Sequence, residues 1–210
     1  MQIETILEDS INSILIVTPG ESKNIVIAVP HHAPIGASTL PCKEHPDADE
    51  GAGFLGYYLS RLLNCYSVIA CNYFLDSNKH KESDYCKKII SLKPEILVEI
   101  HGHGVRNAKY DIEISSGGSD RNCWSQAMAQ RLGTRLSDKP SLQGYSLSGD
   151  YDAIYFKASG SFTITTNKWI PFHIELPKPI RQDRDQSALF CEALAGTIND
   201  VLRDLDKIEC

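Results

Sequence analysis

The sequence lacks the features that mark several large classes of protein. No hydrophobic run among its 210 residues approaches the length of a membrane-spanning helix. The segment Met1–Glu8 carries acidic side chains where a secretory signal would carry basic ones. The net charge of −6 argues against a basic surface for nucleic acid. We therefore expect a cytoplasmic protein whose partners include neither nucleic acid nor a membrane.

The seven cysteines are odd in number and scattered, with no Cys-x-x-Cys pair. This spacing excludes a zinc ribbon and is typical of reduced thiols. No Gly-x-Ser-x-Gly motif is present, so the sequence offers no nucleophilic serine of the esterase type. There is also no linker and no internal repeat, and we expect residues 1–210 to form one domain.

Short apolar segments alternate with amphipathic ones along the chain. Strands are expected at 14–17, 24–30, 67–72, 96–101, 110–114 and 170–177, and helices at 54–63, 82–92, 124–136 and 186–208. The strand at 110–114 alternates polar and apolar residues, as a half-exposed strand does, and residues 144–166 are expected to form a long loop or a β-hairpin. Strands that alternate with helices predict an α/β fold with a largely parallel sheet covered on both faces.

Two of the expected buried strands end in histidine. His31 and His32 follow the strand at 24–30, and His101 ends the strand at 96–101. The carboxyl ends of parallel strands meet at one edge of a sheet, and this edge is where open α/β sheets bind ligands. The histidines of both strands should therefore lie near one another at that edge.

Two carboxylates should join these histidines. Glu175 lies near the end of the last strand, and Asp49 belongs to an acidic cluster that is expected to cap the helix after it. Two neutral imidazoles and one carboxylate with an open fourth position form the ligand set of a catalytic zinc, and a second carboxylate nearby can act as general base. His31, Asp49, His101 and Glu175 are therefore the candidate metal site.

Five motifs, taken in order, resemble those of the N-formylglutamate amidohydrolase family. They are Pro30-His31-His32-Ala33, Asp47-x-Asp49-x-Gly51, Asp76-Ser77-Asn78-Lys79, Glu99-Ile100-His101-Gly102 and Ile174-Glu175-Leu176. The resemblance covers residues 25–185, and its signal lies in the order of the motifs. This family belongs to the zinc carboxypeptidase-like hydrolases, which also include the poly-γ-glutamate hydrolases.

The resemblance implies a three-layer αβα sandwich of the phosphorylase/hydrolase-like type and a zinc-dependent amidohydrolase activity. His31, Asp49 and His101 would bind one Zn²⁺ per chain, and Glu175 would take the proton from the attacking water. The bond cleaved would be the amide bond of an N-acyl amino acid such as N-formylglutamate, or that of a small γ-glutamyl or peptide substrate.

Three positions in these motifs have more than one interpretation. Glu50 could replace Asp49 as a ligand, and His32 could replace His31, although the family motifs favour Asp49 and His31. Glu99 lies in a strand that should be buried, where it either orients a metal-binding histidine or is hydrogen-bonded in the core.

Two further histidines lie close to the expected edge. His103 and His173 could line the pocket and stabilise a developing oxyanion, or they could be structural. The sequence alone favours the structural role for both, because most isolated histidines near a strand end satisfy local hydrogen bonds.

The sequence departs from the family in the motif that binds the substrate. The family's Asp-x-Asn-Arg motif binds the substrate's carboxylate, and here it ends in Asn78 and Lys79. Lysine keeps the positive charge but lacks the planar fork of arginine; Arg181, just beyond the last strand, could compensate. Because of this departure, the alternative function is that of a non-catalytic domain that binds small acids or regulates another protein.

Overall fold

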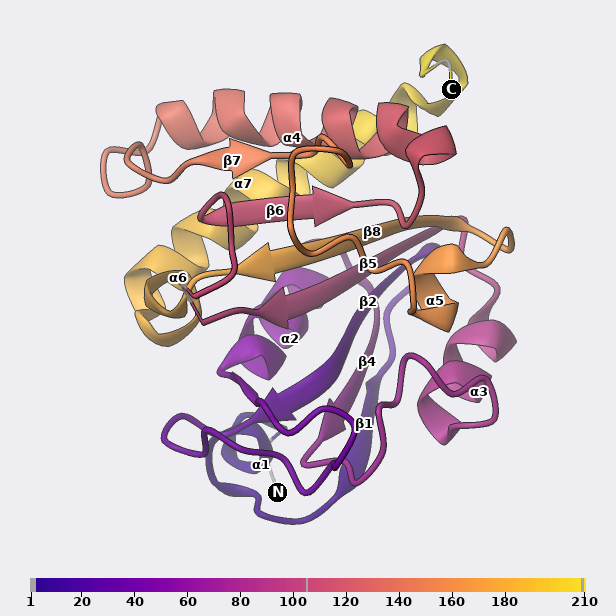
Figure 1. The fold of residues 1–210 in the computed structure, drawn as a ribbon, viewed down its shortest axis with the longest axis vertical. Helices are drawn as coiled ribbons and strands as arrows, with labels where there is room; N and C mark the ends of the chain where they lie inside the picture. The colour runs from indigo at the N-terminus through magenta and orange to yellow at the C-terminus, as the bar shows by residue number, and fades with distance from the viewer. Residues whose placement is uncertain (1–2, 105, 209) are drawn as a thin grey trace.

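The computed structural model describes residues 3–104, 106–208 and 210, and its centre is a sheet with the strand order β1-β4-β2-β5-β8-β6-β7 (Figure 1). The strands are β1 (Ile14–Thr18), β2 (Ser22–Ala33), β3 (Asp49–Glu50), β4 (Cys65–Cys71), β5 (Ile96–Gly102), β6 (Ile112–Ser115), β7 (Leu147–Ser148) and β8 (Ile170–Leu176). The central strands β4, β2, β5 and β8 are parallel, whereas β1 and β6 run antiparallel to β4 and β8. β3 pairs with the end of β2, outside the main strand order.

Helices cover both faces of this sheet. They are α1 (Ile3–Asp9), α2 (Ala52–Leu62), α3 (Asp84–Leu92), α4 (Asn122–Ser137), α5 (Phe162–Thr165), α6 (Lys178–Gln182) and α7 (Arg184–Arg203), with short 3-10 turns η1 (Ser119–Arg121) and η2 (Leu205–Lys207). α3 and α5 pack on one face, and α2, α4 and α7 pack on the other (Figure 1). The predicted three-layer α/β architecture with a mainly parallel sheet is confirmed. In the part of the chain that the structure describes, no helix is both long and apolar enough to cross a membrane.

The sequence of β2 explains its place near the centre of the sheet. Ile25, Ile27 and Val29 belong to the apolar core that includes α2, while Val26 and Ala28 belong to the core on the α3 side. All five side chains are at most 3% exposed. A parallel strand between two helical layers needs apolar residues on both faces. β2 therefore forms a rigid base for the polar residues at its end.

The strand that carries His31 is longer than the sequence predicts. β2 continues through Pro30 to Ala33 instead of ending at Pro30. Successive side chains of a strand point to opposite faces. Because β2 continues through both residues, the side chains of His31 and His32 point to opposite faces of the sheet. The sequence alone could not show which of the two faces the metal site.

The sequence predicts that the acidic cluster before α2 caps that helix, and this prediction is wrong. Asp49 and Glu50 form the short strand β3, and the N-cap of α2 is Gly51, which makes no side-chain hydrogen bond there. Gly51 has a φ of +78°, and a Cβ at this position would lie 2.5 Å from the carbonyl oxygen of Arg181. Only glycine suits this turn, which holds Asp49 in line with the end of β2.

Two other segments differ from their predicted structure. Residues 162–165, whose alternation suggests a strand, form the short helix α5. β6 is buried along its whole length and is not half-exposed, because its polar side chains have partners inside the protein. Polar alternation here reflects internal hydrogen bonding and not contact with solvent.

The prediction of reduced thiols is wrong for two of the seven cysteines. Cys123 in α4 and Cys210 near the end of the chain form a disulfide that closes a loop with a sequence separation of 87 residues. The other five cysteines are free and buried. Disulfides form in oxidising environments, so the bond gives no support to the cytoplasmic location predicted from the sequence.

Candidate metal centre

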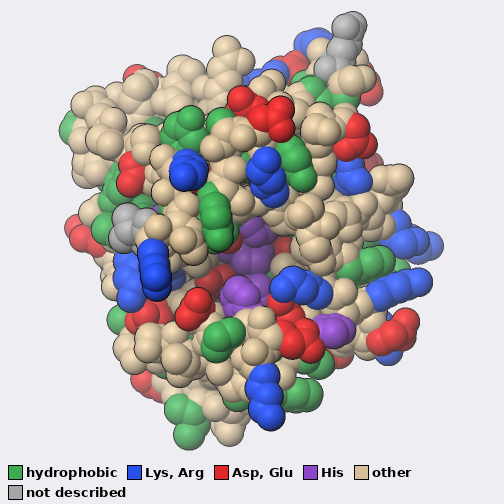
Figure 2. Space-filling view, viewed as in Figure 1, with side chains coloured by type: hydrophobic (Ala, Val, Ile, Leu, Met, Phe, Trp, Pro, Cys, Tyr) green, Lys and Arg blue, Asp and Glu red, His purple; other side chains and the backbone are tan. Residues whose placement is uncertain are grey.

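Three parallel strands and β3 deliver polar side chains to one edge of the sheet. His31 lies near the end of β2, His101 near the end of β5 and Glu175 near the end of β8. The pairing of β3 with β2 places Asp49 opposite His32 in the backbone register, and the pairing of β5 with β8 places His101 beside Glu175. Figure 2 shows histidine side chains on the floor of a hollow in this part of the surface.

His31, Asp49 and His101 form a compact set of possible metal ligands. Nδ1 of His31 lies 3.6 Å, and Nδ1 of His101 lies 3.4 Å, from the same carboxylate oxygen, Oδ2 of Asp49. Each of these residues is at most 4% exposed. Within the described residues, His31 Nδ1 and Asp49 Oδ2 have no hydrogen-bond partner. Ligand atoms of a tetrahedral zinc site are about 3.3 Å apart, so this donor set fits a zinc ion.

The other ring nitrogen of each histidine meets a carboxylate. His31 Nε2 lies 3.0 Å from Oδ1 of Asp76, and His101 Nε2 lies 3.4 Å from Oε2 of Glu99. A carboxylate accepts the proton of Nε2 and thereby leaves the lone pair at Nδ1, an arrangement typical of metal-binding histidines. The sequence leaves open whether Glu99 orients a metal-binding histidine or is only hydrogen-bonded in the core. Its contact with His101 favours the first role.

The side chains of Asn78 and Lys79 contact the carboxylates of Glu99 and Asp76, respectively. Lys79 Nζ lies 2.5 Å from Oδ2 of Asp76, while the side-chain amide of Asn78 donates to Glu99 at 3.3 Å. The hydroxyl of Tyr85 also donates to Glu99, at 2.9 Å. A cavity opens over Asp49 and His101, and among the described residues that line it there is neither Asn78 nor Lys79. The structure therefore does not bring these two predicted substrate ligands to the cavity.

The buried acids and bases of this cluster stabilise one another. Burial acts to raise the pKa of Asp49, but the close contacts with His101 and His31 outweigh it and hold that pKa well below its ordinary value. Burial acts to lower the pKa of His101, but contacts with Asp49 and Glu99 raise it to about 10. The cluster thus favours positive charge at this point, carried either by protons or by a metal ion.

Glu175 faces the same cluster from β8. Its side chain is buried, and burial raises its pKa to about 7. Oε1 lies 3.4 Å from Nε2 of His173, and Oε2 has no hydrogen-bond partner within the residues that the structure describes. A carboxyl group with a pKa near neutrality is suited to accept a proton and return it.

The two competing ligands are engaged elsewhere. Glu50 accepts from the backbone N–H of Gly36 at 2.9 Å and lies 3.1 Å from Nζ of Lys178. His32 Nε2 bonds the carbonyl oxygen of Leu7 at 3.1 Å, and burial lowers the pKa of His32 to about 4. The geometry therefore favours Asp49 over Glu50 and His31 over His32.

A cavity of about 480 Å³ opens over the cluster, and Asp49, His101 and Glu175 line it. Arg181 also lines it; its guanidinium is buried and donates to the backbone carbonyls of Leu176 and Glu50. The structure therefore brings this predicted substrate ligand to the cavity wall.

The sequence does not single out three residues beside the cavity. His45, from the loop before β3, stacks on His31 with ring centroids 3.8 Å apart. Phe156 lines the cavity and stacks on His103. Glu113 lies in β6, directly opposite Glu175 of β8. Only Glu113 has a signal in the sequence, namely a carboxylate between two isoleucines of a strand.

Glu113 joins two loops that border the cavity. Its Oε1 accepts from the backbone N–H groups of Lys109 at 2.7 Å and Tyr110 at 3.2 Å. Its Oε2 accepts from the backbone N–H groups of Tyr155 at 2.9 Å and Phe156 at 2.8 Å. Four backbone donors thus satisfy a carboxylate that is 0% exposed, and the loops are held in register with β6.

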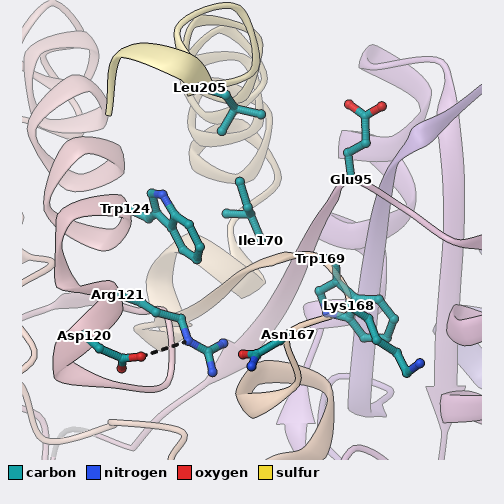
Figure 3. Close-up of a pocket in the computed structure, with 9 residues that line it drawn as sticks. All are labelled: Glu95, Asp120, Arg121, Trp124, Asn167, Lys168, Trp169, Ile170 and Leu205. Carbon is teal, nitrogen blue, oxygen red and sulfur yellow. Dashed lines mark ion pairs between the residues drawn. The ribbon is translucent and has the colours of Figure 1, made fainter. Parts of the chain in front are cut away.

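A second and larger cavity, of about 620 Å³, lies at the other end of β5 and β8 (Figure 3). Arg121, Trp124 and Trp169 are among its lining residues. The guanidinium of Arg121 donates to the three carbonyl oxygens of residues 164–166, and Trp169 Nε1 donates to the carbonyl of Thr163. The hydrogen-bonding groups of these two side chains are therefore already paired within the protein.

No protein-family model matches the chain, and no curated protein is similar to it in sequence. Solved structures are similar in fold. A bacteriophage poly-γ-glutamate hydrolase has a TM-score of 0.59 at 11% identity, with 93% of each chain covered. The gene product Atu2144 of Agrobacterium tumefaciens has a TM-score of 0.60 at 13% identity, covering 93% of this chain and 97% of that one.

An N-acetylmuramoyl-L-alanine amidase of Nostoc punctiforme, AmiC2, is a more distant match. It has a TM-score of 0.51 at 14% identity, with coverage of 88% of this chain and 99% of that one. The chain therefore has a fold that hydrolases and amidases also use. At this level of identity the likeness establishes the fold alone, and the predicted membership of the N-formylglutamate amidohydrolase family has no support from these matches.

Proposed function

We propose that this protein is a zinc-dependent hydrolase that cleaves the amide bond of an N-acyl amino acid or of a small γ-glutamyl or peptide substrate. The observation that carries the proposal is the convergence of His31 Nδ1 and His101 Nδ1 on one buried oxygen of Asp49. Each imidazole is oriented from behind by a carboxylate, as in metal sites of hydrolases.

His31, Asp49 and His101 would hold one zinc ion per chain. Bound there, zinc would supply Lewis acidity that polarises the substrate's carbonyl group and makes water a better proton donor. The cluster offers two nitrogens and one oxygen, which leaves one tetrahedral position open to substrate or water.

Glu175 is the proposed general base. Its buried carboxylate takes a proton from the attacking water as the oxygen of that water bonds to the amide carbon. The proton then passes to the leaving nitrogen as the carbon–nitrogen bond breaks. The raised pKa of Glu175, about 7, suits a group that must both accept and donate this proton near neutral pH.

The names of two proteins with a similar fold support an amide substrate. Poly-γ-glutamate hydrolase and N-acetylmuramoyl-L-alanine amidase both act on amides of amino acids, as their names state. Lys178 at the cavity wall is paired with Glu50, whereas Arg181 forms no ion pair among the described residues, and its charge favours a substrate that carries a carboxylate.

The test is metal content and turnover, measured on the same preparations. The wild-type chain is expected to hold about one zinc per chain, as the three-ligand set implies. His101→Ala should lose the zinc, whereas Glu175→Gln should keep it and lose turnover of a panel that contains N-formylglutamate, γ-glutamyl peptides and an N-acetylmuramoyl peptide. A wild-type protein that takes up no zinc, or a fully active Glu175→Gln, would overturn the proposal.

A further inference from the structure

A hydrogen bond to the backbone fixes which ring nitrogen of His103 carries the proton. Its Nε2 lies 2.8 Å from the backbone carbonyl oxygen of Asp111. A carbonyl oxygen only accepts hydrogen bonds, so Nε2 carries the proton. In the neutral ring Nδ1 is then a bare acceptor. His103 is only 4% exposed, and among the described residues Nδ1 has no hydrogen-bond partner.

The position of this ring is held firmly. Phe156 stacks on His103 with ring centroids 5.6 Å apart and an interplanar angle of 22°. Glu113 in turn binds the backbone N–H of Phe156, and the backbone N–H of His103 bonds the carbonyl of Leu176 at the end of β8. The ring of His103 is therefore held in a preorganised position by the end of β8 and the loop before α5.

His103 and Phe156 line the same cavity as Asp49, His101 and Glu175. A buried acceptor that lacks a partner is costly, and a ligand with a suitable donor relieves that cost. In the proposed reaction, the zinc held by the metal ligands would polarise the carbonyl group, and Glu175 would take the proton from water. None of them provides for the N–H of the amide.

We infer that His103 Nδ1 accepts a hydrogen bond from the N–H of the substrate's amide group, so that the site selects secondary amides over N-alkylated amides. This inference rests on the proposed function. It assigns His103 a role opposite to stabilisation of an oxyanion, because a bare nitrogen cannot donate to a negatively charged oxygen. A site built to pair with an N–H discriminates strongly against an analogue that lacks it.

The first experiment measures the premise directly. Long-range ¹H–¹⁵N correlation spectra of zinc-loaded Glu175→Gln are expected to show His103 protonated at Nε2 and bare at Nδ1. Addition of γ-glutamylglutamate should shift the Nδ1 resonance, whereas the analogue with a methyl group on the amide nitrogen should not. Protonation at Nδ1, or an equal response to both probes, or a response to neither, would overturn the inference.

The second experiment is a cycle of enzyme and substrate variants. Methylation of the amide nitrogen of γ-glutamylglutamate should lower kcat/KM by at least about tenfold for the wild type. For His103→Phe, which keeps a flat ring against Phe156, the same methylation should change kcat/KM by less than about threefold. Equal losses in both proteins would also overturn the inference.

A matched control and the zinc content separate the possible failures. His80→Phe changes an exposed histidine that pairs with Glu44, outside the cavity, and should behave as the wild type. Zinc binding with equal losses in the cycle leaves the proposed hydrolase intact and removes only the role of His103. Absence of zinc in every preparation would remove the proposed function itself.

Discussion

The two ends of β5 and β8 carry cavities of very different character. The cavity at the starts of these strands is the larger, about 620 Å³ against about 480 Å³. Yet two of the polar side chains that line it, those of Arg121 and Trp169, are paired with backbone carbonyls. At the carboxyl ends, buried atoms of His31, Asp49, His103 and Glu175 have no partner among the described residues. Leaving buried polar groups unpaired costs free energy of folding. Such unpaired groups, and not the volume of a cavity, indicate where a ligand binds.

The largest expected effect compares one residue from each cavity. Asp49→Ala removes the oxygen on which both imidazoles converge. It should abolish zinc binding and lower kcat/KM by at least about 10³-fold, because Lewis acidity is worth several kcal/mol. Trp124→Ala in the other cavity should lower the free energy of unfolding by about 2 kcal/mol and leave zinc content unchanged. Loss of zinc in Trp124→Ala would break the comparison.

The disulfide should matter for stability and not for chemistry. It joins Cys123, which is next to Trp124, to Cys210, which follows η2. Trp124 and Leu205 of η2 both line the larger cavity. Because the closed loop is long, Cys123→Ser should lower the free energy of unfolding by about 4 kcal/mol in denaturant titrations. Zinc content should not change. A reductant should destabilise the wild type but have no effect on the variant; equal responses would contradict this role for the bond.

Glu113 tests whether the smaller cavity depends on its supporting loops. In Glu113→Gln, one side-chain oxygen is replaced by an amide nitrogen, which cannot accept from two of the four backbone donors. The free energy of unfolding should fall by about 3 kcal/mol, and KM should rise more than kcat falls while zinc content is kept. The control is Glu192→Gln at an exposed pair with Lys139, worth less than about 1 kcal/mol. Unchanged KM in Glu113→Gln would show that the loops do not position substrate.

Much of the smaller cavity could be predicted because its framework is built from local patterns. The apolar runs of β2, β5 and β8 mark them as buried parallel strands, and such strands bring their ends to one edge of a sheet. His31, His101 and Glu175 follow from this rule, and the structure brings them together with Asp49. Their roles stay predictions until metal binding is measured.

The features that could not be predicted depend on contacts between distant parts of the chain. The choice of His31 over His32 follows from the continuation of β2 past Pro30, where local rules favour an end to the strand. The burial of Glu113 depends on backbone donors more than 40 residues away in sequence, at Tyr155 and Phe156. α6 is too short to show helical periodicity, yet it carries Arg181 to the cavity.

The smallest expected effect concerns the residue that departs from the family motif. Lys79 is 47% exposed and pairs with Asp76, which contacts Nε2 of His31 and so orients the ring. Because such a half-exposed ion pair contributes at most about 1 kcal/mol, Lys79→Ala and Lys79→Arg should each change KM by less than about threefold. Arg181→Lys, within the cavity wall, should raise KM more than either variant, because lysine cannot reproduce the paired hydrogen bonds of the guanidinium. A rise of KM by about tenfold or more in Lys79→Ala, reversed in Lys79→Arg, would instead make residue 79 the group that binds the substrate's carboxylate, as the family motif implies.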